Sequence, residues 1–301
     1  ATITQPLMRS LHLLAISLTL LATTRAGPGS GQPIFPTGRV PGERAGTYGN
    51  ESGHYTITNV TVPALYPRLV SGATTVVIIC PGGAYKVLSW VLEGETAARW
   101  LNSLNVSAYI LKYRVPLRPW LAFGEAQLVD LQRAVGVVRS QSPAGIKLGV
   151  LGFSAGAHLS AHLSNDWARR SYPRIDDADD LSARPAFAML LYPWCVVGNQ
   201  SAHDDNCDAG SNRTLSMSPT SETPSTFLVQ AEDDPVKPEN AIFYFLGLKT
   251  AHAPASELHV YPRGGHGFGL CDNRSLEVCA WPERAAEYLE AQGLISRPLP
   301  G

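Results

Sequence analysis

The sequence predicts an α/β fold with a mostly parallel central sheet and helices on both faces. Strand-length apolar segments alternate with segments of helical spacing along most of the chain. The central strand segments, such as residues 75–80 and 186–192, are apolar almost throughout rather than at every second residue. Continuous apolar strands are typical of a parallel sheet that is buried on both faces.

The elements follow one another in a regular order. The predicted strands cover residues 54–62, 75–80, 106–113, 148–153, 186–192, 226–231 and 256–261. The predicted helices cover residues 93–104, 124–140, a segment directly after Ser154, 238–250 and 282–292. The first strand alternates polar and β-branched residues and is expected at an edge of the sheet.

Two polar, acidic segments interrupt this alternation, at residues 165–183 and 197–224. We expect both to be surface insertions over the carboxyl edge of the sheet, where α/β proteins bind their ligands. The acidic run 176–180 in the first of them fits a solvated loop better than a calcium site.

Composition excludes some classes of partner and leaves others. The 301 residues include 24 basic and 25 acidic side chains, so no charge excess favours nucleic acid or an anionic membrane. We expect no cofactor and no metal, because the cysteines and histidines lack the spacing of metal ligands. No apolar run is long enough to span a membrane.

The N-terminal residues are typical of a secretory signal. Arg9 precedes an apolar run from Leu11 to Ala22, and small residues flank a plausible cleavage point after Ala26. A buried N-terminal helix is the alternative. We therefore predict upstream residues plus a signal peptide over 1–26 and a secreted, extracellular protein with no membrane contact after cleavage.

Glycosylation sequons and cysteines fit the same compartment. Six asparagines stand in Asn-x-Ser/Thr, more than chance predicts; they are Asn50, Asn59, Asn105, Asn199, Asn212 and Asn273. Two pairs of cysteines each bracket a short loop, which predicts disulfides in an oxidising compartment; the pairs are Cys271 with Cys279 and Cys195 with Cys207. Cys80 is left over in an apolar strand and is expected to be a buried thiol.

A candidate nucleophile lies between a predicted strand and a predicted helix. Ser154 is the centre of Gly152-Phe-Ser-Ala-Gly156, the pattern of a sharp turn that exposes a serine at the carboxyl edge of a sheet. An ordinary tight turn is the alternative, because the pentapeptide by itself is a weak signal.

A nucleophilic serine requires a base, and the base requires a carboxylate to orient it. His266 lies on a glycine-flanked loop directly after a predicted strand. The acid is expected on the loop after the preceding strand, where Glu232-Asp233-Asp234-Pro235 stands. We favour Asp234, which the following proline holds extended, and keep Asp233 as the alternative.

The anionic intermediate of acyl transfer requires fixed N–H donors. The amide of Ala155 at the start of the helix is one candidate. The amides of Gly83 and Ala84, in the turn Pro81-Gly-Gly-Ala-Tyr85, are the others. The alternative for this turn is a plain corner between a strand and a helix.

These motifs resemble the α/β-hydrolase esterases of the acetyl-xylan and feruloyl esterase group. The resemblance rests on Pro81-Gly-Gly-Ala-Tyr85, Glu93-Gly94, Tyr113-Arg114, Gly152–Gly156, Asp234-Pro-Val236 and Gly264-Gly-His-Gly-Phe268, and extends over about residues 54–292. It implies the α/β-hydrolase fold, with Ser154, Asp234 and His266 as the triad. It also implies hydrolysis of acetyl or other short-acyl esters, often on carbohydrate.

We therefore expect a secreted serine esterase whose partner is a small-molecule or carbohydrate ester. The predicted organisation is a flexible lead-in without core residues over 27–50 and an α/β-hydrolase catalytic domain over 51–297. A serine exopeptidase similar to prolyl oligopeptidase is one alternative, although it would normally need a large extra N-terminal domain. A non-catalytic binding protein with a hydrolase fold is the other, although all three triad candidates are present. A lipase is disfavoured because no long apolar lid is visible.

Overall fold

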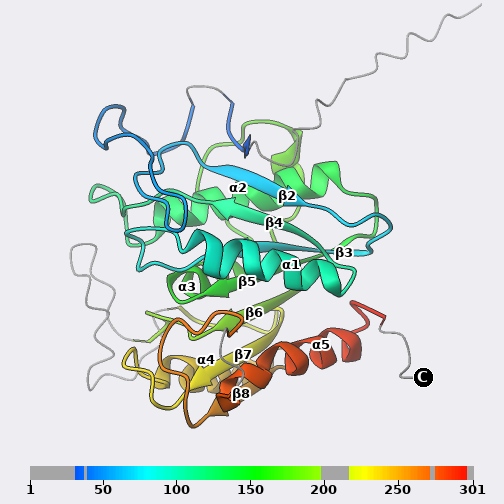
Figure 1. Cartoon of the computed structure of the whole chain (residues 1–301). Coiled ribbons are helices and arrows are strands. Elements are labelled where there is room, and N and C mark those ends of the chain that lie inside the picture. The colour runs from blue at the N-terminus through cyan, green and yellow to red at the C-terminus, as the bar shows by residue number, and fades with distance from the viewer. Residues whose placement is uncertain (1–30, 37–38, 198–216, 272–274, 297–301) are drawn as a thin grey trace, which may run out of the picture.

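The computed structural model describes residues 31–36, 39–197, 217–271 and 275–296. At its centre is an eight-stranded sheet with the order β1-β2-β4-β3-β5-β6-β7-β8 (Figure 1). β2 is antiparallel to both of its neighbours, and all other pairs are parallel. The strands are β1 (Gln32–Pro33), β2 (Ala64–Arg68), β3 (Thr75–Cys80), β4 (Ser107–Lys112), β5 (Lys147–Phe153), β6 (Phe187–Leu191), β7 (Ser225–Ala231) and β8 (Glu257–Tyr261).

Helices cover both faces of the sheet (Figure 1). They are α1 (Thr96–Ser103), α2 (Glu125–Gln141), α3 (Ala155–Asp166), α4 (Glu239–Thr250) and α5 (Trp281–Ala291). The rings of Trp100 in α1 and Trp281 in α5 meet at 5.1 Å on one face. On the other face the side chains of Asn165 at the end of α3 and Tyr244 in α4 are hydrogen-bonded at 2.9 Å. The predicted fold class is confirmed.

The core explains the apolar strands. Every residue of β3, β4, β6 and β7 is buried, as required when helices pack on both faces of a parallel sheet. A turn of π-helix, η1 (Trp90–Glu95), precedes α1 directly. Two short 3₁₀ turns, η2 (Asp177–Asp180) and η3 (Glu277–Ala280), lie in connections.

The prediction of an edge strand over residues 54–62 is wrong. That segment forms only isolated bridges, among them Ile57 with Leu88, and Asn59 interrupts it with a φ of 54°. The strand that pairs antiparallel with β4 is β2. Its sequence does not indicate a strand, because it contains Pro67. Pro67 is tolerated because β1 pairs only with the first two residues of β2, so the outer side of β2 is open there.

The expectation that residues 27–50 contribute nothing to the core is wrong for Ile34 and Phe35. Both side chains are buried in the main hydrophobic cluster, and the strand β1 immediately before them pairs with β2. The guanidinium of Arg133 in α2 donates a 2.8 Å hydrogen bond to the carbonyl oxygen of Ile34. The high Pro and Gly content of this segment led to the expectation of a flexible lead-in, although Ile34 and Phe35 belong to the core.

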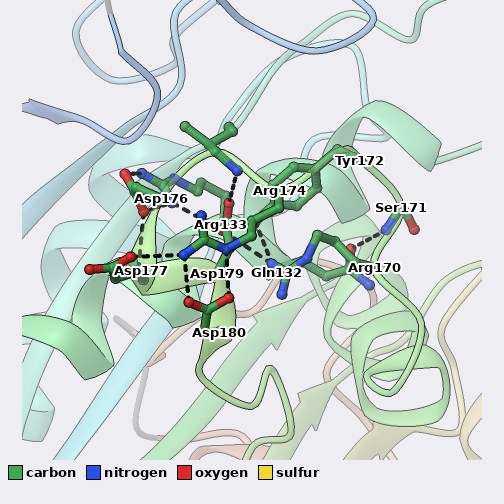
Figure 2. Close-up of polar contacts among 12 residues, drawn as sticks. Gln132, Arg133, Arg170, Ser171, Tyr172, Arg174, Asp176, Asp177, Asp179 and Asp180 are labelled. Atoms are coloured by element: carbon green, nitrogen blue, oxygen red, sulfur yellow. Dashed lines mark hydrogen bonds and ion pairs between the residues drawn. The ribbon is translucent and has the colours of Figure 1, made fainter.

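The same guanidinium holds the first acidic segment (Figure 2). Arg133 donates to the carboxylates of Asp176, at 2.6 and 2.7 Å, and of Asp179, at 3.0 Å. Asp179 is only 1% exposed and also accepts a 2.6 Å hydrogen bond from the hydroxyl of Tyr172. The acidic run is therefore paired with cations rather than simply solvated.

The expected position of residues 165–183 is also wrong. α3 begins at the carboxyl ends of the strands and runs back along the sheet, so the segment after Asp166 lies toward the opposite edge, where β6 begins. The second predicted insertion, 197–224, falls mostly outside the described residues. Neither segment therefore gives evidence for a cover over the carboxyl edge.

Candidate active site

Ser154 joins β5 to α3 in a strained backbone conformation. Its φ is 51° and its ψ is −117°, values that residues other than glycine rarely adopt. A Cβ on Gly152 would lie 2.2 Å from the carbonyl oxygen of Gly156, and a Cβ on Gly156 would lie 1.9 Å from that of Cys80. Glycine is therefore required at both positions, because any side chain there would collide with the backbone.

Three side chains predicted from the sequence lie in one hydrogen-bonded row. Oγ of Ser154 is 2.8 Å from Nε2 of His266, and Nδ1 of His266 is 2.8 Å from Oδ2 of Asp234. With the carboxylate accepting from Nδ1–H, Nε2 is left as the acceptor for the serine hydroxyl. The row has the connectivity of a serine nucleophile, its base and an orienting acid.

Asp234 is held by contacts of its own. It is 5% exposed, and its carboxylate also accepts hydrogen bonds from the side chain of Gln230 at 2.8 Å and the amide of Val236 at 2.7 Å. Charge-assisted hydrogen bonds of this kind fix the direction of a buried carboxylate.

The alternative acid, Asp233, faces elsewhere. Its Oδ1 accepts hydrogen bonds from the amides of Gly264 and Gly265, at 2.9 and 2.7 Å. Asp233 thus shapes the backbone of the loop that carries His266, whereas its neighbour contacts the imidazole itself. The structure brings Asp234, and not Asp233, to the histidine.

Two of the three predicted N–H donors belong to the turn 81–85, and the third, Ala155, directly follows the serine. A Cβ on Gly82 would be 2.9 Å from Cβ of Ser154, so the turn 81–85 abuts the serine. In the described part of the chain, the amides of Gly83, Ala84 and Ala155 donate no hydrogen bond to another protein group. All three N–H groups are therefore available to an incoming oxygen.

Neighbouring carbonyl groups fix the direction of these amides. The carbonyl oxygen of Gly82 accepts from the amide of Ser89 at 2.9 Å, and that of Gly83 accepts from Lys86 at 2.9 Å. The carbonyl oxygen of Ser154 accepts from Ala157 at 2.9 Å. Because a trans peptide is planar, anchoring each C=O sets the opposite direction of the N–H that follows it.

The turn itself is strained and anchored by a buried side chain. Gly83, Ala84 and Tyr85 have φ values of 128°, 53° and 55°, which non-glycine residues adopt only where the surroundings enforce it. The hydroxyl of Tyr85 lies 2.7 Å from Nδ1 of His158 in α3. The described residues contain no cluster of three or more metal-ligating side chains.

The sequence motifs gave no role to two further residues of the site, although Glu93 stands in one of them. Glu93 in η1 is 4% exposed, and its Oε2 accepts a 2.6 Å hydrogen bond from the amide of Gly82. Its Oε1 accepts a 2.8 Å hydrogen bond from the hydroxyl of Tyr192, directly after β6. Burial raises the pKa of the Glu93 carboxyl, although hydrogen bonds from Tyr192 and Gly82 favour its charged form.

The loop after His266 is closed by a disulfide between Cys271 and Cys279, as the sequence predicts. Cys80 is a buried free thiol, and burial raises its pKa to about 12. Cys207 lies outside the described residues, so its pairing with Cys195 stays a prediction.

The structure describes only some of the residues on which the prediction of secretion depends. Residues 1–26 lie outside the described residues, as do Asn199, Asn212 and Asn273. Asn50 and Asn105 are exposed and Asn59 is half-buried. Within the described ranges no helix combines the length and the apolarity that a bilayer crossing requires.

The sheet order, the strained serine between β5 and α3, and the Ser–His–Asp row define an α/β hydrolase. More particularly, the chain is similar to acetylxylan esterases. An acetylxylan esterase of Xylanibacter ruminicola is 28% identical over 211 residues, which are 63% of this chain and 40% of that protein. An endo-1,4-β-xylanase B of Butyrivibrio fibrisolvens is 29% identical over 213 residues, 65% of this chain and 33% of that protein.

Solved structures give the same picture. An acetyl ester-xyloside bifunctional hydrolase from Caldicellulosiruptor lactoaceticus has a TM-score of 0.73 and 28% identity, covering 91% of this chain and all (100%) of that one. A carboxylesterase from Lactobacillus plantarum shares the fold, with a TM-score of 0.63 and 20% identity over 78% of this chain and 94% of that one. No model of a known protein family matches the chain. The chain aligns with less than half the length of the curated relatives.

Proposed function

We propose that the protein is a serine esterase that hydrolyses acetyl or other short-acyl esters on a carbohydrate. The observation that carries the proposal is the hydrogen-bonded row from Ser154 through His266 to Asp234. The carbohydrate part rests on the relatives, which are named as an acetylxylan esterase and an acetyl ester-xyloside hydrolase.

In the proposed reaction Oγ of Ser154 attacks the acyl carbonyl carbon while Nε2 of His266 takes the hydroxyl proton. The carbonyl oxygen becomes an anion that the amides of Ala155, Gly83 and Ala84 stabilise. When the tetrahedral intermediate collapses, the alcohol leaves with the proton from His266. Water then attacks the acyl-enzyme by the same route and releases the carboxylic acid.

The acid, the serine turn and the N–H donors each have a defined role in this reaction. Asp234 holds the imidazole in the required tautomer and stabilises the imidazolium that forms. The strained turn at Ser154 aims the hydroxyl away from the strand and toward the histidine. Because the amides are already anchored through their carbonyl neighbours, little reorganisation is needed as the negative charge develops.

Secretion and glycosylation belong to the same proposal. We infer that residues 1–26 include a signal peptide and that the six sequon asparagines carry glycans, of which Asn50 and Asn105 have exposed side chains. An extracellular location suits an enzyme that meets a polymeric ester and suits the disulfide at Cys271.

The test is hydrolysis by the purified protein and by Ser154→Ala, on nitrophenyl acetate and acetylated xylan. The variant is expected to lose about 10³-fold or more in kcat with an unchanged melting temperature. An organophosphonate should label wild-type protein once, at Ser154. Cleavage of amino-acid amides in preference to esters would favour the peptidase alternative, and binding of acetylated xylan without hydrolysis would favour the binding protein.

A further inference from the structure

One buried carboxylate, that of Glu93, contacts both the turn that holds the N–H donors and the residues that pack around His266. Glu93 accepts one hydrogen bond from the turn that holds the N–H donors, through Gly82, and one from Tyr192 on the histidine side. Burying a carboxylate is costly unless hydrogen bonds or opposite charges compensate for the lost water. Two charge-assisted hydrogen bonds to separate segments give that compensation and link the segments.

On the first side, Glu93 acts on the peptide before Gly82. Its 2.6 Å bond to the Gly82 amide fixes one flank of this residue, and the 2.9 Å bond from the Ser89 amide to the Gly82 carbonyl fixes the other. The hydroxyl of Tyr113 donates to the carbonyl oxygen of Pro81 as well. With both flanking peptides held, the N–H of Gly83 has one direction.

On the second side, Glu93 acts through Tyr192. The tyrosine hydroxyl donates to Glu93 and accepts a 3.1 Å hydrogen bond from the amide of Gly269, three residues after the histidine. The ring of Tyr192 also packs on His266 and Phe268, with ring centroids 5.0 and 4.4 Å apart. The loop that carries the base is thus tied to the same carboxylate.

We propose that Glu93 is a positioning residue. It fixes the turn 81–85, which carries the proposed oxyanion donors, relative to the loop that carries His266. The inference rests on the proposed function, since it needs Ser154 and His266 to be the reacting pair. Glu93 touches neither the substrate nor the serine in this role. Its removal should slow the chemical step and leave substrate affinity nearly unchanged, because the geometry it sets matters most in the transition state.

A purely structural role is the competing explanation, and the chain contains a matched control for it. Asp179 is also a buried carboxylate that accepts from a tyrosine hydroxyl, that of Tyr172 at 2.6 Å, and from a backbone amide, that of Ile175 at 2.8 Å. It lies in the ion-pair cluster around Arg133 (Figure 2), in the connection from α3 to the start of β6, whereas Ser154 follows the end of β5. Changing it should affect stability alone.

The experiment compares Glu93→Gln, Tyr192→Phe and Asp179→Asn with wild type, measuring kcat and KM on nitrophenyl acetate and the melting temperature. We expect Glu93→Gln to lower kcat about 10-fold or more with KM changed by less than about threefold. Tyr192→Phe, which keeps the contact with Gly82 but breaks the link to Gly269, should lower kcat about fivefold or more. Asp179→Asn should lower the melting temperature with kcat within about twofold of wild type.

Glu93→Leu extends the series, because it keeps the side-chain volume and leaves both donors without an acceptor; its kcat should fall about 100-fold. If it fails to fold, the glutamine and phenylalanine variants still decide the question. A kcat within about twofold of wild type in both of these would overturn the inference, whatever their melting temperatures. A raised KM with unchanged kcat would also overturn it, since that marks a substrate contact.

Ser154→Ala, measured beside the series, separates this inference from the proposed function. Activity that is lost in Ser154→Ala but kept in Glu93→Gln and Tyr192→Phe removes the positioning role and leaves the esterase. Activity that is kept in Ser154→Ala removes both.

Discussion

The hydroxyl of Tyr85 lies 2.7 Å from Nδ1 of His158, and both residues are buried. Tyr85 ends the turn 81–85, and His158 lies one helical turn after Ser154 in α3. The bond therefore connects the backbone that offers N–H donors to the helix that begins at the nucleophile. A displacement of one would carry the other with it.

The burial of His158 makes stability depend on pH. Burial lowers the pKa of His158 well below 6.5, and the neighbouring His162 lowers it further. The unfolded chain takes up a proton near pH 6.5 that the folded chain does not, so stability is highest above that pH and is lost as the pH falls below it. The expected slope is at most about 1.4 kcal/mol per pH unit.

The measurement is the melting temperature of wild type and His158→Asn between pH 7.5 and 5.5, over about two pH units around the ordinary histidine pKa. Asparagine keeps an acceptor near the Nδ1 position but does not titrate. We expect the wild-type melting temperature to fall more steeply toward low pH than that of the variant. Parallel curves would assign the pH dependence to other groups.

The two adjacent aspartates should differ in their effect on catalysis. Asp234→Asn removes the charge that orients His266 and should lower kcat about 10²- to 10⁴-fold with little change in KM. Asp233→Asn keeps an oxygen that can accept from Gly264 and Gly265, so its kcat should stay within about threefold of wild type. Steady-state kinetics on nitrophenyl acetate distinguishes them, and an inactive Asp233→Asn with an active Asp234→Asn would reverse the assignment.

The disulfide that follows the histidine loop should contribute to stability through the unfolded state. Its cysteines are eight residues apart, and closing a loop of this size is expected to stabilise the fold by about 2–3 kcal/mol. The double variant Cys271→Ser with Cys279→Ser should melt about 5–10 °C lower. This variant is a cleaner test than a reducing agent, which would also act on the predicted disulfide between Cys195 and Cys207. An unchanged melting temperature would contradict the assignment of a stabilising role.

Loss of the Arg133 side chain should lower the free energy of unfolding and leave activity unchanged. Arg133→Met leaves the carboxylate of Asp179 buried without this cation and removes the bond to the Ile34 carbonyl, at an expected cost of about 3–5 kcal/mol. Hydrogen exchange should increase together at residues 31–36 and 176–180, which share this one guanidinium. Increased exchange in only one segment would show that the two are held independently.

Local patterns in the sequence predict the fold class and the row of Ser154, His266 and Asp234. Buried parallel strands leave continuous apolar runs, and a nucleophile turn needs glycines at fixed spacing, so both are visible in short stretches. Ser154, His266 and Asp234 each follow a predicted strand, and the carboxyl ends of parallel strands meet at one edge of a sheet. The proline after Asp234 was enough to favour it over its neighbour.

What the sequence did not reveal depends on contacts between distant segments. The link from Glu93 to Tyr192 spans 99 residues, and no local pattern marks either as a partner of the other. The acidic segment was misplaced because its composition is that of a solvated loop, whereas Arg133 binds it from a helix 43 residues away. β2 was missed because Pro67 is acceptable only beside an open edge, which sequence spacing does not show.

The contacts at Gly152 and Gly156 have a consequence for how this protein can diversify. Backbone meets backbone there, so the position of the nucleophile does not depend on the identity of any neighbouring side chain. Saturation mutagenesis should find these two sites intolerant, while exposed positions such as Tyr55, at 74% exposure, should accept many residues. Substrate range can then change by exchange of exposed residues without displacing the serine, so that selection for substrate range and selection for the fold act on separate parts of the chain.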